Sequence, residues 1–161
     1  MQRLPAVILT AGVLMLATLS ATAGELTFNA SRSAGEIGVG QDWRVQVKGS
    51  ALTIERFGRR ARTRQLSTDE VDALGRAILT PAFAALRETY GCRTCTDISF
   101  CSIEVTAGPA TQHVAVFEYV QTPPGAETRE GRELEQFYRA WQLIKELAGL
   151  DGIPDHCRRR R

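Results

Sequence analysis

The chain has 161 residues, of which 43% are hydrophobic and 24% are charged. This length suits one ordinary globular domain and leaves no room for a second large one. The 20 basic and 18 acidic residues give a formal net charge of +2. Such a balance disfavours a dedicated nucleic-acid-binding protein, because affinity for the phosphate backbone needs a clear basic excess. The four cysteines are too few for a disulfide-dense miniprotein and need their own explanation.

The first 23 residues have the layout of a secretory signal peptide. Arg3 supplies a positive charge, residues 6–19 form an apolar run, and Ala21-Thr22-Ala23 offers the small residues of a cleavage site. The run of about 14 residues is shorter than the roughly 20 that span a bilayer. We therefore expect cleavage after Ala23 and a periplasmic or secreted protein without a transmembrane segment. The near absence of lysine among the basic residues favours a bacterial source.

Extended segments and two helices are predicted in the first half of the domain. Residues 26–28 begin an extended segment, and three glycines within 33–40 permit tight turns. Apolar and polar residues alternate over 43–47, and a Gly-Ser turn leads to a second strand, so a β-hairpin is expected. A capping box that starts at Ser67 predicts a helix, and Pro81 opens a short second one.

A second hairpin and a long helix are predicted in the second half. Residues 97–106 and 112–120 flank an Ala-Gly-Pro turn and form the two strands. Apolar residues recur every three or four positions over 128–148, which predicts an amphipathic helix. Gly149 is expected to end that helix.

These elements predict a two-layer α+β domain. We expect an antiparallel sheet of about four strands, arranged as two hairpins, with two main helices on one face in the order ββαββα. The domain spans residues 24–150 and follows the signal peptide of residues 1–23. Residues 151–161 form a C-terminal tail that contains a cysteine and a run of arginines.

The cysteines fit three interpretations. Cys92, Cys95 and Cys101 could bind zinc together with His113 or His156, since Cys-x-x-Cys is a common half-site. A redox role for the Cys-x-x-Cys pair is the second interpretation, but the flanking strand and helix of thioredoxins are missing. Structural disulfides are the third, and we favour them because an exported chain meets an oxidising environment and the number of cysteines is even.

The expected disulfides are Cys92 with Cys95 and Cys101 with Cys157. Cys101 lies in the middle of a predicted strand and faces the core, whereas Cys157 lies beyond the last helix. Cys157 therefore needs a bonding partner that is distant in the sequence. Closing so long a loop stabilises a fold by about 4 kcal/mol in the chain-entropy account.

Charged residues form three clusters. The first arginine cluster contains Arg56, Arg59, Arg60, Arg62 and Arg64, and the second is the run 158–161. Arginines suit phosphate or carboxylate partners, but we favour a solvated edge strand for the first cluster and a disordered end for the second. The acidic residues at the start of the last helix complement its dipole; they are Glu127, Glu130, Glu133 and Glu135. Neither these carboxylates nor His113 and His156 have the spacing of a catalytic site, so we predict no enzyme and no cofactor.

Several short motifs follow one another in a familiar order. Residues 33–39 read Ser-Ala-Gly-Glu-Ile-Gly-Val, similar to a Ser-Gly-Gly-x-x-Gly-Ile stretch, and a helix opening follows at 66–74. Later motifs are Phe83 with Leu86, Asp97 with Ile103 and Val105, His113 with Val114, and Pro124.

This order, over roughly residues 26–148, resembles the emfourin family of small inhibitors of thermolysin-like metalloproteases. Ala34 stands where that family has a second glycine, and Cys101 stands where an aromatic residue is usual. The resemblance implies an α+β fold and inhibition of a metalloprotease.

We predict an exported, non-enzymatic protein-binding module, with a secreted protease or another envelope protein as its partner. An inhibitor fills a cleft with a rigid loop, so the expected binding residues are Ser33, Gly35, Glu36, Ile37, Gly38 and Val39. Two alternatives stay open. One is a zinc-binding or redox protein that uses Cys92, Cys95 and Cys101, and the other is an envelope-associated structural protein whose arginine tail binds anionic lipid or cell-wall polymer.

Overall fold

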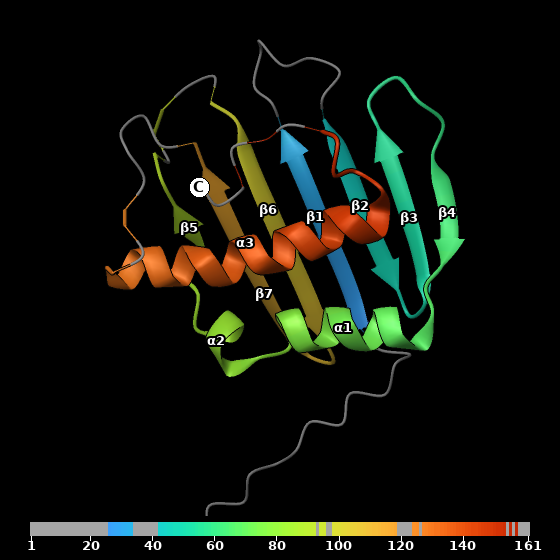
Figure 1. Ribbon diagram of the computed structural model, residues 1–161, viewed down its shortest axis with the longest axis horizontal. Helices are drawn as coiled ribbons and strands as arrows, with labels where there is room; N and C mark the ends of the chain where they lie inside the picture. Colours follow the sequence, from blue (N-terminus) through green and yellow to red (C-terminus); the bar gives the residue numbers. More distant parts are fainter. Residues whose placement is uncertain are drawn as a thin grey trace, which may run out of the picture.

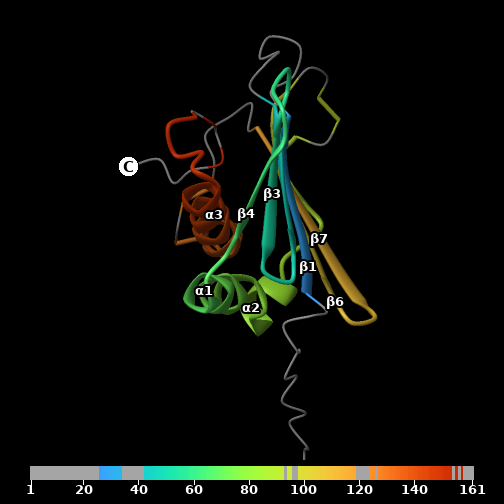
Figure 2. The same ribbon diagram turned by 90° about the vertical axis from the view of Figure 1, so that its right-hand side faces the viewer.

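The computed structural model describes residues 26–33, 42–92, 94–95, 98–118, 124–125, 127–153, 155 and 157. The predicted signal peptide lies outside the described residues. The chain forms one seven-stranded sheet with all three described helices on the same face (Figures 1 and 2). Within the described part of the chain, no helix is both long enough and apolar enough to cross a membrane.

The sheet contains two long antiparallel stretches joined through the first strand. The strands are β1 (Leu26–Ser33), β2 (Trp43–Lys48), β3 (Ala51–Arg56), β4 (Arg62–Gln65), β5 (Thr89–Tyr90), β6 (Phe100–Ala107) and β7 (Ala110–Phe117). Their order across the sheet is β4-β3-β2-β1-β6-β7-β5. All neighbouring strands are antiparallel except β5 and β7, which are parallel.

The predicted α+β class is confirmed, but the predicted four-stranded sheet and ββαββα order are wrong in detail. The described elements run β1 to β4, α1, α2, β5 to β7 and α3. β1 was expected only as a short extended segment, whereas it pairs with β2 on one side and β6 on the other. β4 and β5 have four and two residues, too few to show a periodic apolar pattern in the sequence.

The three helices begin and end where local chemistry requires. α1 (Thr68–Ile78) starts with the predicted capping box, in which Ser67 and Glu70 bond to each other's backbone amides. α2 (Pro81–Ala84) starts at the predicted proline. α3 (Arg129–Ala148) ends at Gly149, whose φ of 64° is left-handed and favours glycine.

The core lies between the helices and one face of the sheet. Alternate residues of the strands, such as Phe28, Val45 and Ile103, are buried there together with the apolar stripe of α3. Trp141 of α3 is central, since its ring stacks on Trp43 of β2 with 4.8 Å between ring centroids. Burial of such large aromatic side chains is a major contribution to the stability of the fold.

Both predicted disulfide bonds are present with the predicted pairing, Cys92 with Cys95 and Cys101 with Cys157. Cys101 is fully buried in β6, so its bond fixes the segment after α3 against the covered face of the sheet. Two disulfides fit an oxidising, extracellular or periplasmic environment.

A buried ion pair also holds the segment after α3 against the domain. The Lys145 ammonium lies 2.7 Å from the Asp155 carboxylate, and their side chains are 5% and 0% exposed. Trp141 donates its indole N–H to the same carboxylate oxygen at 3.3 Å, and Lys145 also donates to the carbonyl of Ile153. The described part of the predicted tail is therefore packed into the domain.

Arg64 joins the edge strand β4 to two helices. Its guanidinium donates to both carboxylate oxygens of Glu70, at 2.9 and 3.1 Å, and to the carbonyl of Leu147 near the end of α3. The hydrogen bond from Arg64, with that from the Ser67 backbone, lowers the pKa of Glu70 from its usual 4.5 to about 2.

Candidate functional site

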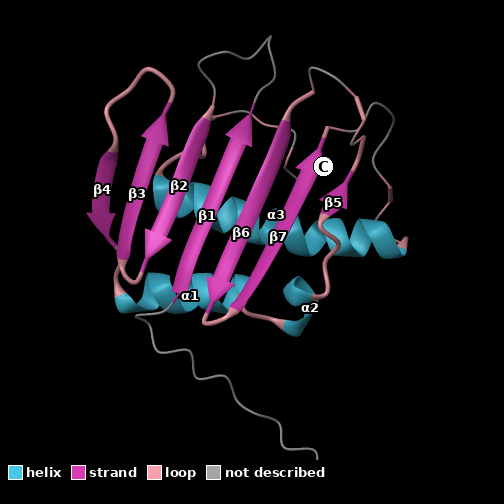
Figure 3. Ribbon diagram, turned by 180° about the vertical axis from the view of Figure 1, so that it is seen from behind, coloured by secondary structure: helices cyan, strands magenta, loops and turns pink. Residues whose placement is uncertain are grey.

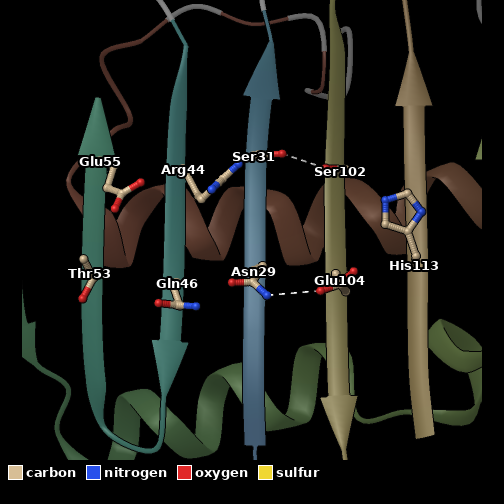
Figure 4. Close-up of a pocket in the computed structure, with 9 residues that line it drawn as sticks. All are labelled: Asn29, Ser31, Arg44, Gln46, Thr53, Glu55, Ser102, Glu104 and His113. Atoms are coloured by element: carbon tan, nitrogen blue, oxygen red, sulfur yellow. Dashed lines mark hydrogen bonds between the residues drawn. The ribbon is translucent and has the colours of Figure 1, made fainter. Parts of the chain in front are cut away.

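The face of the sheet opposite the helices is not covered by any described helix (Figure 3). Because side chains alternate along each strand, the residues between the buried ones point to this side. They line an open hollow of about 430 Å³ that spans five strands (Figure 4). Its lining consists of Asn29, Ser31, Arg44, Gln46, Thr53, Glu55, Ser102, Glu104 and His113.

Strand register arranges these side chains in two rows. The first row crosses the sheet from β3 to β7 as Thr53, Gln46, Asn29, Glu104 and His113. The second row, one step along the strands, runs as Glu55, Arg44, Ser31 and Ser102. Neighbours in a row come from strands that are distant in the sequence, so the site is created by the fold and has no local motif.

The centre of the hollow is held by two cross-strand hydrogen bonds. The Asn29 amide donates to the Glu104 carboxylate at 3.2 Å, and the Ser31 and Ser102 hydroxyls lie 2.9 Å apart. Figure 4 shows both bonds between β1 and β6. These side chains are half-buried and fixed before any ligand arrives, which reduces the entropy lost on binding.

The margins of the hollow differ from its centre, because their polar groups are exposed. Arg44, Gln46, Glu55 and His113 make no side-chain hydrogen bond or ion pair with another described residue. They offer a guanidinium, an amide, a carboxylate and an imidazole to solvent. The hollow therefore combines an ordered centre with free donors and acceptors around it, an arrangement suited to recognising a polar surface.

The polar hollow contains one imidazole, from His113, and two carboxylates, from Glu55 and Glu104. His113 lies opposite Glu104 across β6 and β7, and no hydrogen bond joins the two side chains. Over the described ranges, no group of three or more His, Cys, Asp or Glu side chains is placed to hold a metal ion.

The structure describes only one of the predicted binding residues. Ser33 is the last residue of β1, where it is paired with Phe100 of β6. It lines a second hollow, of about 460 Å³, at the end of the sheet from which residues 34–41 continue the chain. The other predicted binding residues lie outside the described residues: Gly35, Glu36, Ile37, Gly38 and Val39.

The residues of the predicted zinc alternative are not brought together as free ligands. All four cysteine sulfurs are in disulfide bonds, so no thiolate is available while the protein is oxidised. Cys101 faces the core, whereas His113 faces the open side of the sheet. His156 lies outside the described residues.

The charged clusters of the sequence have different surroundings. Arg62 and Arg64 lie in β4, which is an edge strand as expected for this cluster. Of the glutamates at the start of α3, Glu133 accepts from Arg129 at 2.7 Å and from Tyr90 at 3.0 Å. The bond from Arg129 is the main reason that the pKa of Glu133 is lowered. The arginines at 158–161 lie outside the described residues.

The polar residues of the open face were missed by the sequence analysis. A signal was present in β1, where Thr27, Asn29 and Ser31 alternate with the buried Phe28 and Ala30. The run is short, and the glycines that follow it directed attention to the loop. No known protein family matches the chain, and no curated protein sequence shows a significant match to it.

Proposed function

We propose that the protein is an exported, non-enzymatic protein-binding module whose open sheet face contacts the partner. The observation that carries this proposal is the polar hollow. Its centre is prearranged by the Asn29–Glu104 and Ser31–Ser102 hydrogen bonds, and its margins keep exposed donors and acceptors. The covered face, to which the Cys101–Cys157 disulfide is anchored, provides a rigid support for such a surface.

Ser33, the one described residue of the predicted binding loop, lies on the same surface. Ser33 lies two residues after Ser31 and four after Asn29 along β1, so its side chain points to the same open face. Residues 34–40 follow it in the sequence. We assign the partner-binding segment to residues 33–39 and to Arg44 and Glu55, which line the same hollow as Ser33. The partner class that we propose is a secreted metalloprotease of the thermolysin type. This choice rests on the resemblance of the short sequence motifs to the emfourin family.

The partner class is tested by titrating the oxidised protein against a thermolysin-type protease. We expect inhibition at micromolar concentrations, and we expect Ile37→Asp and Arg44→Glu to abolish it. Arg76→Glu, an exposed change of equal charge on α1, is the control that should leave inhibition unchanged. No inhibition by the wild-type protein would remove the protease from the proposal.

A further inference from the structure

The turn between β3 and β4 combines an exposed aromatic ring with a cluster of arginines. Figure 2 shows this turn at the upper end of the sheet, beyond the three helices. The Phe57 side chain at its start is 63% exposed, more than any other large apolar side chain in the described residues. Arg59 and Arg60 follow within three positions and are also exposed.

The turn is a fixed structure that presents these side chains outward. The Phe57 amide donates to the carbonyl of Asp42 at 3.1 Å, and the Arg59 amide donates to the carbonyl of Arg56 at 3.0 Å. Gly58 lies between them with φ of 68°, a left-handed conformation that favours glycine. Two hydrogen bonds and one glycine thus fix the backbone of the turn, on which the ring of Phe57 is exposed.

Four arginines surround a hollow of about 670 Å³ beside this turn. They are Arg56, Arg59, Arg60 and Arg62, with Ile54, Gly58 and Ala61 as the remaining described lining. No acidic side chain is among the lining residues. None of the four guanidinium groups makes an ion pair or hydrogen bond with another described residue, whereas the neighbouring Arg64 is held by Glu70. Four uncompensated positive charges at one hollow attract an anionic partner.

We propose that this turn docks the protein on an anionic lipid surface. The guanidinium groups would contact lipid phosphates, and the ring of Phe57 would enter the interface. The exposed ring of Phe57 favours a lipid surface over an acidic protein segment as the anionic partner. An acidic protein segment must match its carboxylates to the individual arginines, whereas a lipid surface accepts any arrangement of arginines and also takes up an exposed aromatic side chain.

The lipid site adjoins the proposed partner-binding face, because Phe57 and Arg56 line the second hollow together with Ser33, Arg44 and Glu55. Arg62 is paired with the buried Ile54, and Arg56 with the buried Trp43, so both arginines belong to the helix side of the sheet. The polar hollow lies on the other side. The arginine hollow shares no lining residue with the polar hollow, and the lipid inference does not depend on the proposed function.

Vesicle binding tests the inference. The oxidised full chain is mixed with vesicles of phosphatidylglycerol or of phosphatidylcholine, and the bound fraction is measured by flotation. We expect binding to the anionic vesicles only, and release at about 1 M salt, where the screening length falls to about 3 Å. The double variant Arg59→Glu/Arg60→Glu should bind at least about 25-fold more weakly, since each arginine near a lipid surface contributes about five-fold.

Matched controls separate the turn from general charge and general exposure. Arg76→Glu/Arg139→Glu makes the same change of charge on α1 and α3 and should lose far less binding. Phe57→Ser should weaken binding several-fold, while Leu79→Ser, at the other large exposed apolar side chain (43% exposed), should not. Arg59→Lys/Arg60→Lys keeps the charge and should retain most of the binding, which also shows that substitution of the turn leaves the protein folded.

Several outcomes would overturn the inference. They are equal binding to both kinds of vesicle, wild-type binding by Arg59→Glu/Arg60→Glu, and an equal loss in the control pair. Release by inorganic phosphate at constant ionic strength would show a site for free phosphate instead of a surface. Retention on immobilised polyglutamate without vesicle binding would favour an acidic protein partner.

Discussion

The two faces of the sheet are built from the same strands and differ in what their side chains contact. On the covered face, Phe28, Val45 and Ile103 are fully buried under the helices. On the open face, Arg44 and Gln46 flank the buried Val45 along β2. Neither side chain makes a hydrogen bond or ion pair with another described side chain. One strand therefore buries half of its side chains in the core and leaves the other half exposed on the face that we propose for recognition. Substitutions on the two faces should have effects of different kinds.

Replacing the central tryptophan of the covered face gives the largest expected loss of stability. Trp141→Ala removes the stacks on Trp43 and Phe137 and the hydrogen bond to Asp155. We expect the free energy of unfolding, measured in urea, to fall by about 3–5 kcal/mol. Gln46→Ala on the open face should change it by no more than about 0.5 kcal/mol. A similar loss in both variants would contradict the division between the faces.

Removing the long-range disulfide should be nearly as costly. Cys101→Ser/Cys157→Ser opens a closure between residues 56 positions apart, and we expect a loss of about 4 kcal/mol. Cys92→Ser/Cys95→Ser opens a closure of three positions, and the same account gives about 1.5 kcal/mol. Urea unfolding of the two variants and the wild type without reductant, so that every remaining disulfide stays closed, measures both values. Equal losses would mean that the bond to Cys157 does not anchor the segment after α3.

Breaking the buried ion pair should cost about 3 kcal/mol. Lys145→Met leaves the Asp155 carboxylate buried without its cation, which is more costly than replacing both partners. We expect Lys145→Met/Asp155→Leu to recover part of the lost stability in the same urea experiment. If the double variant is no more stable than the single one, the penalty comes from lost packing and not from the unpaired charge.

The smallest expected effect is the loss of stability in acid when Glu70, the partner of Arg64 in the edge strand β4, becomes protonated. The folded protein holds the pKa of Glu70 at about 2, below its usual 4.5. The contribution of Glu70 to stability is therefore complete above pH 4.5 and is lost as the pH falls toward 2. Glu70→Gln should remove this part of the pH dependence of urea unfolding. Asp72→Asn, an exposed change on the same helix, is the control, and an unchanged profile in Glu70→Gln would contradict the assignment.

Local patterns in the sequence were enough to predict most individual elements. The capping box at Ser67, the apolar stripe of α3 and the alternation of β2 each depend on residues close in the sequence. The pairing of Cys101 with Cys157 followed from one residue facing the core and the other lying beyond the last helix. The individual elements could be predicted because the residues that form them are close in the sequence, and the disulfide could be predicted because only one long-range pairing of two cysteines was needed.

The open face could not be predicted in the same way. Asn29 meets Glu104, and Ser31 meets Ser102, only because β1 lies between β2 and β6. The position of β1 is a long-range pairing that no short pattern specifies. The short strands β4 and β5 were missed as members of the sheet for a related reason, since their pairing depends on neighbours that are already in place.

Site-specific photo-crosslinking from the open face tests the central claim most directly. A photoreactive side chain is placed at Gln46 on the open face or at Gln142 on the exposed side of α3, and adducts are collected from whole cultures of the source cell, including the medium. We expect a discrete protein adduct from Gln46 that Arg44→Glu abolishes, and none from Gln142. Equal adducts from both positions, or adducts from Gln142 alone, would contradict a partner-binding role for the open face.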